Sequence, residues 1–464
     1  MGKEVQEMRQ RTVRVARGLA TLLALALVAA ACGGTDDTTT TSTTAAAAAP
    51  AATTTTAPAP PAEAEPIIVG DLAYFTGDFG DIGAYLAAQV DFPILEVINL
   101  DPPLGRPMVV IHEDIGTVGE AQAARKLLEQ DGADILVSAA HNYLTYRDFL
   151  LDWQDSNNGP LMPTVHGGAI PGNIGGICGE PIFRAQGLDE GQGVTDVLYA
   201  ESVGVESVVL ITTPTSGYQL TADAIEEALP IVGIELLERI DAPGEQASYR
   251  TEIQRAVDLD PDAIMIQGQA GESAIMVKQA FEAGFSTYMI GEAGWVEPEF
   301  PTTATNEAIA FHKAVVFPGF GFQDNEAWAF YQPLWDNNPD YTQHTTADDF
   351  YSYTTYDVLI VTALAIEAAG SIDGCDWAEA VQSITDAPGT VCYTYPDCLA
   401  LIRAGEEVDY DGVTGPGTYS PTGVNAVIPA VFAYSDDGDF SEDSRVDAER
   451  HLEILDQVAF EFEE

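Results

Sequence analysis

The stretch Ala133-Asp134-Ile135-Leu136-Val137-Ser138-Ala139-Ala140-His141, followed by residues 143–156 and by Pro160 to Pro171, predicts a strand, a helix and a second strand. The apolar runs 135–137 and 162–165 are short and bounded by small or turn-forming residues, which is typical of buried parallel strands. In an open α/β sheet, ligands bind at the carboxyl ends of the strands. Helices that follow such turns offer free N–H groups to an anion. The turns 138–141 and 166–169 are therefore predicted to form half of a binding site.

Strands and helices alternate on both sides of this stretch, which predicts an α/β fold with parallel, doubly wound sheets. The pattern restarts after Phe183-Arg184, so we expect two units of similar size with the ligand site in the cleft between them. Residues 314–319 are expected to form a strand that returns the chain to the first unit. The expected elements are strands 67–73, 108–111, 207–212, 234–240, 263–267 and 288–290, and helices 84–100, 118–131, 219–229, 249–257, 273–283 and 350–369.

The charge balance of the chain is extreme, with 18 Lys plus Arg against 73 Asp plus Glu and a formal net charge of -55. Such an acidic surface repels nucleic acid and anionic lipid, so no nucleic-acid partner is expected. A solvated acidic coat suited to a saline habitat is the favoured interpretation. Attraction of a cationic ligand is the alternative.

The N-terminus has the pattern of an export signal. Basic residues end at Arg17, an apolar run covers 19–28, and Ala29-Ala30-Ala31-Cys32 follows. The run is too short to span a bilayer and ends in small residues, so residues 1–31 are predicted to be a cleavable signal peptide. Cys32 after small residues resembles a bacterial lipobox, which implies lipid on its sulfur and anchoring to the outer face of the cell membrane. An ordinary signal with an incidental cysteine is the alternative.

Residues 32–66 are almost wholly Thr, Ala and Pro and are predicted to be an extended tether. The remaining cysteines are Cys178, Cys375, Cys392 and Cys398, and an even number in an exported protein indicates disulfides. Three pairings are possible, and the close spacing of Cys392 and Cys398 favours a local loop there. No Cys-x-x-Cys or nearby His supports a zinc site instead.

Sequence motifs of catalysis are missing from the chain. It has no Gly-x-Ser-x-Gly, His-Glu-x-x-His, phosphate-binding Gly-x-x-x-x-Gly-Lys or dinucleotide-binding Gly-x-Gly-x-x-Gly pattern. His141 and His166 occupy the two turns of the first stretch, but no third metal ligand stands at a suitable spacing. We therefore expect a binding protein and not an enzyme, without cofactor or metal.

An ordered set of short motifs runs through roughly residues 67–440. The motifs are Val69-Gly70, Phe75-Thr76-Gly77, Gly83, Glu113-Asp114, Ala121 to Gly132, Phe183-Arg184, Gly191-Gln192-Gly193, Asp262 to Gly268, Lys278-Gln279-Ala280, Gly284, Tyr356-Asp357, Thr414-Gly415-Pro416 and Asp437-Gly438. Each motif alone is mostly glycine and apolar residues. In its order and spacing, the set resembles the leucine/isoleucine/valine-binding family, the type I substrate-binding proteins of ABC importers.

The resemblance implies two lobes joined by a three-strand hinge and closing on a small ligand. Lobe 1 is expected to hold residues 67–183 and 318–418, and lobe 2 residues 184–317 and 419–464. Ser138 stands where the family has a serine that touches the ligand carboxylate. The residues expected to bind the ligand are Ser138, Ala139, His141, Gly168, Ala169, Tyr218, Gln269, Glu292 and Trp295.

Two departures from the family pattern concern the groups that hold an α-amino acid. Gly168-Ala169 stands where the family's amino-acid binders have Ala-Thr, so the threonine hydroxyl is absent. Glu292 is one position from the acid that pairs with a ligand ammonium, and a one-residue shift at a strand end turns a side chain the other way. Tyr218 and Trp295 are expected to form walls of the cleft.

The function implied is an extracytoplasmic solute-binding lipoprotein. It would capture a small polar or amino-acid-like solute by hinge closure and deliver it to the permease subunits of an ABC importer. A ligand-sensing receptor ectodomain is the alternative within binding proteins, and an enzyme of unknown type is the alternative of another class.

Overall fold

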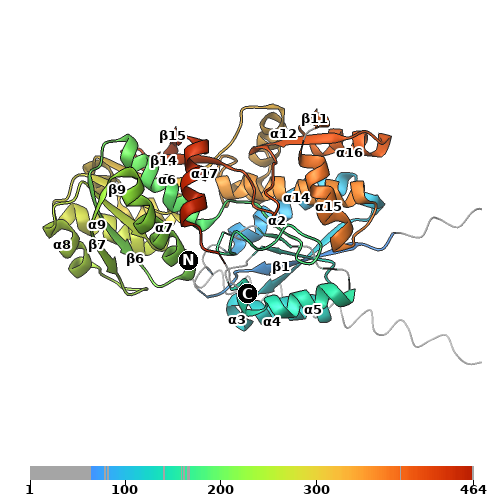
Figure 1. The fold of residues 1–464 in the computed structure, drawn as a ribbon, viewed down its shortest axis with the longest axis horizontal. Helices are drawn as coiled ribbons and strands as arrows, with labels where there is room; N and C mark the ends of the chain where they lie inside the picture. The colour runs from blue at the N-terminus through green and yellow to red at the C-terminus, as the bar shows by residue number, and fades with distance from the viewer. Residues whose placement is uncertain are drawn as a thin grey trace, which may run out of the picture. The chain divides into compact units, whose positions relative to one another are not determined.

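A computed structural model describes residues 64–461 apart from 78–79, 81–82, 139–141, 158, 160–161, 165–167 and 387. The predicted signal peptide, Cys32 and most of the predicted tether lie outside these residues. The described chain forms two α/β layered lobes (Figure 1). Among the described residues, no single helix is long and apolar enough to cross a membrane. The helices Phe350–Ala369 and Gly374–Thr385 together have the length and composition of a membrane span, but they are bent by 110° where they meet.

The first lobe is built on a parallel three-stranded sheet in the order β2-β1-β3, with the short parallel pair β4 and β5 continuing beside β3. This is the alternation that the apolar runs predicted. Its N-terminal elements are β1 (Ile67–Ala73), α2 (Gly83–Glu96), β2 (Met108–Asp114), α3 (Ile115–Val118), α4 (Glu120–Glu129), β3 (Ile135–Ser138), α5 (Arg147–Asn157), β4 (Met162–Thr164) and β5 (Ile182–Arg184), with short 3-10 turns at Ile98–Leu100, Pro103–Gly105 and Tyr143–Thr145.

The second lobe is built on a seven-stranded sheet in the order β15-β14-β10-β9-β8-β6-β7. The strands from β10 to β7 are parallel, whereas β14 and β15 join antiparallel at one edge. Its strands are β6 (Ser207–Thr212), β7 (Glu235–Asp241), β8 (Ala263–Gln267), β9 (Tyr288–Ile290), β10 (Ala314–Gly321), β14 (Ile428–Tyr434) and β15 (Phe440–Arg445), and its helices are α6 (Asp189–Ser202), α7 (Ser216–Val232), α8 (Arg250–Asp258), α9 (Ala270–Glu282), the 3-10 turn η4 (Ala293–Val296), α10 (Glu299–Ala304), α11 (Asn306–Phe311) and α17 (Ala448–Val458).

The chain passes between the two sheets three times. It crosses after β5, after β10, and again before β14. β10 lies wholly in the second sheet between β9 and β14, so the return to the first lobe follows Gly321 and does not occur along residues 314–319 as expected. The segment that returns contains α12 (Glu326–Asp336), α13 (Pro339–Thr342), α14 (Phe350–Ala369), α15 (Gly374–Thr385), β11 (Thr390–Cys392), α16 (Tyr395–Ala404), β12 (Val408–Gly412) and β13 (Gly415–Pro416).

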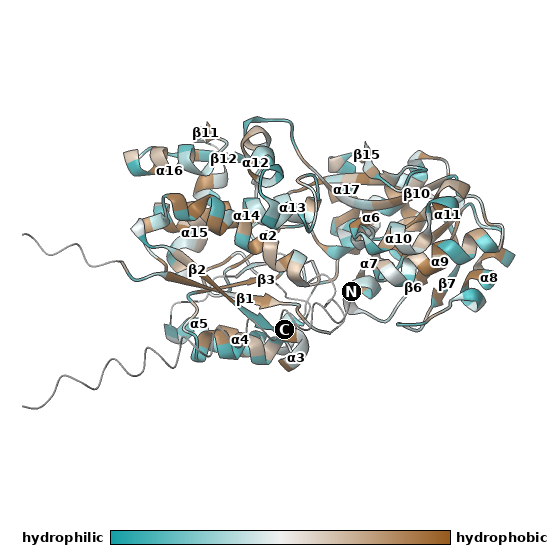
Figure 2. Ribbon diagram, turned by 180° about the vertical axis from the view of Figure 1, so that it is seen from behind, coloured by the Kyte–Doolittle hydropathy of each residue, from teal (hydrophilic) through white to brown (hydrophobic). Residues whose placement is uncertain are grey.

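Helix α14 forms the centre of the returning segment. Residues Ser352 to Ile366 are all buried, so this stretch of the helix lacks a solvent face. It packs against α2, α15 and α16. Figure 2 shows the outer helices, such as α8, with hydrophilic stretches, and more apolar colours in the strands that they cover.

Asp357 is a buried acid in the middle of α14 that holds the segment around β13 in place. Its carboxylate accepts hydrogen bonds from the Tyr410 hydroxyl at 2.8 Å, the Val413 N–H at 3.1 Å, and the N–H and hydroxyl of Thr414, both at 2.7 Å. A buried carboxylate is tolerated when donors surround it in this way. The motifs Tyr356-Asp357 and Thr414-Gly415-Pro416 are therefore two halves of one contact.

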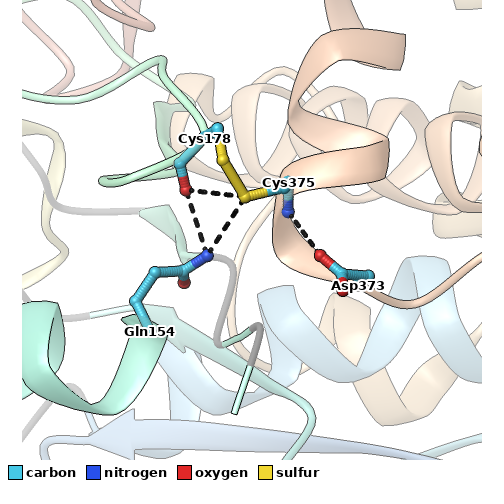
Figure 3. The surroundings of a disulfide bond; sticks show 4 residues. All are labelled: Gln154, Cys178, Asp373 and Cys375. Carbon is cyan, nitrogen blue, oxygen red and sulfur yellow. Dashed lines mark hydrogen bonds between the residues drawn. A yellow bond between two sulfur atoms is a disulfide. The ribbon is translucent and has the colours of Figure 1, made fainter. Parts of the chain in front are cut away.

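Disulfides join Cys178 to Cys375 and Cys392 to Cys398, which is the pairing that the spacing favoured. The first ties the loop before β5 to the first turn of α15, 197 residues away. In Figure 3, the Gln154 amide donates to the Cys178 carbonyl at 3.0 Å, and the Cys375 N–H donates to the Asp373 carboxylate at 2.9 Å. The disulfide therefore fastens the two separate chain segments that make up the first lobe.

Arg184, at the end of β5, is a fully buried cation at the first crossing. Its guanidinium donates to the carbonyls of Pro171 at 2.8 Å, Ile174 at 2.9 Å and Thr422 at 3.0 Å. Burial lowers the pKa of Arg184 to about 10, so it remains charged at neutral pH. One side chain thus connects the turn after β4 with the third crossing.

Replacing Arg184 by Lys is predicted to lower the free energy of unfolding by about 2–4 kcal/mol, because an ammonium keeps the charge but loses the planar fork that reaches several carbonyls. Urea unfolding measures this change. The matched control is Arg255→Lys on α8, where the exposed ion pair with Glu238 is screened by water and contributes little to stability. Equal, small effects of both substitutions would contradict the role given to Arg184.

The two disulfides are predicted to differ in their contribution to stability. By loop-closure entropy, removing Cys178–Cys375 with two alanines should cost about 5 kcal/mol, whereas removing Cys392–Cys398 should cost about 2 kcal/mol, because the second closes a far shorter loop. Urea unfolding of the two double variants measures the difference. The reverse order of stabilities would show that the long loop does not govern the effect.

Candidate functional site

A cavity of about 750 Å³ lies where the carboxyl ends of strands from both sheets meet. Its volume falls within the range of small-molecule sites. The first lobe contributes residues that follow β1 and β2 and the start of α4, and the second lobe contributes residues that follow β6, β8 and β9. The lining includes Tyr74, Thr76, Tyr85, Glu120, Asn142, Gly168, Asp189, Gln192, Thr213, Tyr218, Gln269, Glu272, Glu292, Glu297 and Tyr351.

The turn after β1 forms one wall and depends on two glycines. A Cβ on Gly83 would lie 1.9 Å from the Tyr74 carbonyl oxygen, and one on Gly116 would lie 1.8 Å from that of Thr76. Asp114 caps α3, and its carboxylate accepts hydrogen bonds from the Thr76 N–H at 3.0 Å and hydroxyl at 2.8 Å. Thr76 in the Phe75-Thr76-Gly77 motif is thus a structural residue that holds the turn against α3.

Carboxyl groups dominate the polar lining. The cavity holds Glu120, Asp189, Glu245, Glu272, Glu292 and Glu297, and no Lys, Arg or His among the described residues that line it. Burial raises the pKa of Glu120 and of Asp189 to about 7. Burial also raises the pKa of Glu297 to about 8, helped by the nearby charges of Glu299 and Asp349. The cavity therefore holds protons near neutral pH.

Glu292 follows β9 and caps the 3-10 turn η4. One carboxylate oxygen, Oε2, accepts a hydrogen bond from the Gly294 N–H at 2.7 Å, and the other, Oε1, is buried without a partner. Burial raises the pKa of Glu292 well above its usual range, and Glu297 and Asp189 add to this rise. The side chain thus presents one free acceptor at the wall of the cavity.

Asp189 begins α6 just after the first crossing, and the sequence interpretation did not single it out. A Cβ on Gly168 would lie 2.0 Å from its Oδ1, and one on Gly217 would lie 2.6 Å from its Oδ2. The carboxyl group therefore fits between a turn of the first lobe and the first turn of α7. The sequence offered only a weak indication of this role, namely an acid at the start of a helix together with Gly168 and Gly217 in turns that follow two strands.

Four tyrosines supply the aromatic part of the wall, namely Tyr74, Tyr85, Tyr218 and Tyr351. The Tyr85 hydroxyl donates to Asp349 at 2.7 Å, and Asp349 also accepts from Ser352 at 2.7 Å and from Gln89 at 3.0 Å. This buried network fixes the Tyr85 ring against the start of α14. Only Tyr218 of the four was predicted.

The predicted site residues fall into three groups. Gly168, Tyr218, Gln269 and Glu292 line the cavity, and Ala169 is next to Gly168 but does not line it. The backbone of Ser138 ends β3 beside Leu72, and its side chain is not described. Ala139, His141 and His166 lie outside the described residues.

Trp295 does not form a wall of the cleft, and that prediction was wrong. Its side chain is fully buried and stacks on Phe300 with ring centroids 4.3 Å apart. It also covers Gly291, where a Cβ would lie 2.0 Å from the indole ring. The η4 turn carries the residue inward, and position at a strand end did not reveal that direction.

Metal binding finds no support in the described part of the chain, where no three His, Cys, Asp or Glu side chains are grouped closely enough to hold an ion. The cavity acids are thus spread along the walls and do not converge on one point.

Comparisons with known proteins agree with this architecture. A family model described as periplasmic binding protein matches residues 66–439. Comparison with curated protein sequences gives no significant match.

Solved structures of the same fold include a leucine-binding protein from Thermotoga maritima, with TM-score 0.64, 18% identity and coverage of 83% of this chain and 99% of that chain. A branched-chain amino acid transporter substrate-binding protein from Streptococcus pneumoniae, in complex with isoleucine, has TM-score 0.62 and 16% identity, covering 82% of this chain and 99% of that chain. An ABC transporter solute-binding protein from R. palustris, in complex with benzoate, has TM-score 0.61 and 13% identity, covering 82% and 96%. These are binding proteins of transport systems and not enzymes.

The ligand-free protein is predicted to lose stability as the pH rises from about 5.5 to about 8.5. Asp189, Glu120 and Glu297 have raised pKa values in the folded state, so the folded chain binds more protons than the unfolded chain in this range. The stabilisation is present at low pH and is lost as the pH passes through the folded pKa values, about 7 to about 8. The Tm measured by differential scanning calorimetry should fall by several degrees.

The control is Asp189→Asn, which cannot ionise and should flatten part of this dependence. A Tm that is constant or rises with pH in the unchanged chain would contradict the prediction, since ordinary exposed carboxyl groups are already ionised throughout the range.

Proposed function

Because the chain belongs to the periplasmic binding protein family, we propose that it captures a small polar or amino-acid-like solute outside the cytoplasm and delivers it to the permease subunits of an ABC importer. The observation that carries the proposal is the cavity whose walls come from the strand ends of both sheets. A ligand there touches both lobes at once. Each lobe alone supplies only part of the lining.

The proposed mechanism is closure of the two lobes about the three crossings. A ligand favours the closed state only if it makes more contacts there than in the open state. Closure would bring lining residues of both lobes against the ligand. These are Tyr74, Glu120 and Gly168 on one side and Tyr218, Gln269 and Glu292 on the other. Short crossings such as those after β5 and β10 are suited to absorb the hinge rotation.

We propose lobes of residues 67–183 with 322–418 and of residues 184–321 with 419–464, with the boundary that the sequence placed at residue 318 moved to the end of β10. The proposed ligand contacts are Gly168, Tyr218, Gln269 and Glu292, together with Ser138, Ala139 and His141 from the turn after β3. Lipid on Cys32 and the tether 32–66 would hold the protein at the outer face of the membrane, near a permease. The similar ABC transporter proteins from Streptococcus pneumoniae and R. palustris support the importer as partner.

The proposal predicts one bound solute per chain and no chemical conversion. Native mass spectrometry of the purified chain should show a co-purified small molecule, and small-angle scattering should show a smaller radius of gyration with that molecule bound. Tyr218→Ala should weaken its binding about tenfold by removing aromatic contact. The matched control is Phe460→Ala, which removes an exposed ring that does not line the cavity.

Release of a product from the bound molecule would contradict the proposal and favour an enzyme. Equal affinity of the Tyr218 variant and the unchanged chain would remove the cavity as the binding site.

A further inference from the structure

The charges of the cavity restrict which ligand it can hold. Six carboxyl side chains line it, and none of the described lining residues is basic. A ligand carboxylate placed among them would find no cation to pair with, and every acid that ionises would oppose it as a like charge. The polar lining therefore complements positive charge.

Not all of these acids are free to meet a ligand. Glu120 accepts hydrogen bonds from the Tyr146 hydroxyl at 2.6 Å and the Asn142 N–H at 3.1 Å. Glu272 accepts from the Tyr249 hydroxyl at 3.1 Å and from the Glu245 N–H. These two groups hold loops in place and Glu245 is exposed, so the counter-charges that remain for a ligand inside the cavity are Asp189, Glu292 and Glu297.

Two polar atoms at the wall are buried without a hydrogen-bond partner, the Glu292 Oε1 and the Thr213 Oγ1. Glu292 is 6% exposed and Thr213 is 1% exposed, and both side chains line the cavity. A buried acceptor without a donor destabilises the structure, and does so more when it is charged. A ligand with N–H donors would satisfy the Glu292 oxygen and neutralise its charge together.

The positions of the free acids distinguish an organic cation from a metal ion. Asp189 begins α6, whereas Glu292 and Glu297 flank η4, and no three ligating side chains of the described residues converge on one point. Separate carboxyl groups suit separate positive charges on one elongated molecule. Tyrosine rings between them can face ammonium groups and the alkyl chain that joins these groups.

We propose that the solute is an organic polycation of the polyamine class, with two or more ammonium groups received by Glu292, Glu297 and Asp189 and an alkyl chain held between the tyrosines. The inference rests on the proposed function, because it names the ligand of the same cavity. The strongly negative charge of the whole chain, -55, would draw such a cation toward the protein.

Isothermal titration calorimetry of the purified chain with spermidine and putrescine tests the inference. Leucine, benzoate and magnesium chloride at matched ionic strength serve as comparisons. Spermidine should bind one per chain, more tightly than magnesium. Glu292→Gln should weaken spermidine about ten- to a hundredfold, because it removes a charge-assisted hydrogen bond.

Glu297→Gln is the second variant, and Glu227→Gln, an exposed acid on α7, is the matched control that should leave affinity unchanged. Circular dichroism and Tm confirm that each variant folds. Since the variants are isosteric, an effect confined to Glu292 and Glu297 identifies the cavity and not the acidic surface.

Other outcomes overturn the inference in distinguishable ways. Stoichiometric binding of leucine or benzoate without spermidine would refute a polycation ligand and leave the binding function standing. Equal binding of magnesium and spermidine, or equal effects of all three variants, would show general attraction to the acidic surface. A failure of every solute to bind, with none co-purified, would count against both the polycation and the proposed function.

Discussion

The buried guanidinium of Arg184 is the contact on which the arrangement of the two lobes depends. It lies where the chain first leaves the first sheet, and its donors reach carbonyls in the turn after β4 and in the third crossing. Asp189 begins α6 only five positions later and meets Gly168 in that same turn. A cation satisfied by backbone carbonyls, and not by a single carboxylate, thus sets the position of one wall of the cavity relative to the other.

The cavity places several carboxyl groups close together and away from water. Burial raises the pKa values of Asp189, Glu292 and Glu297, and the charges of Glu297 and Asp189 raise the pKa of Glu292 further. Such a group of acids is stable when protons or a bound cation compensate it. Asp357 shows another solution, in which hydrogen-bond donors from the chain surround the carboxylate.

Much of the fold follows from local patterns, whereas the site depends on contacts between distant segments. The apolar runs of β1, β6 and β8 and the long helix α14 lie where periodicity placed them, because burial on both faces of a sheet leaves a clear signal. Periodicity could not show that β10 stays in the second sheet, since β14 that pairs with it comes over a hundred residues later. Asp189 was missed and Trp295 was predicted wrongly for the same reason. Their roles depend on Gly168, Gly217 and Phe300, and no spacing along the chain reveals which side chains meet across a turn.

The edge strand β15 has a consequence for crowded copies of this protein. Its sequence, Phe-Ser-Glu-Asp-Ser-Arg, alternates half-buried and exposed side chains and includes Glu442 and Asp443. An open sheet edge is a template for strands of neighbouring molecules, and charged residues along it discourage that pairing. Copies at high density would therefore repel each other at this edge, where their sheets could otherwise pair. A high local concentration would then not by itself cause aggregation.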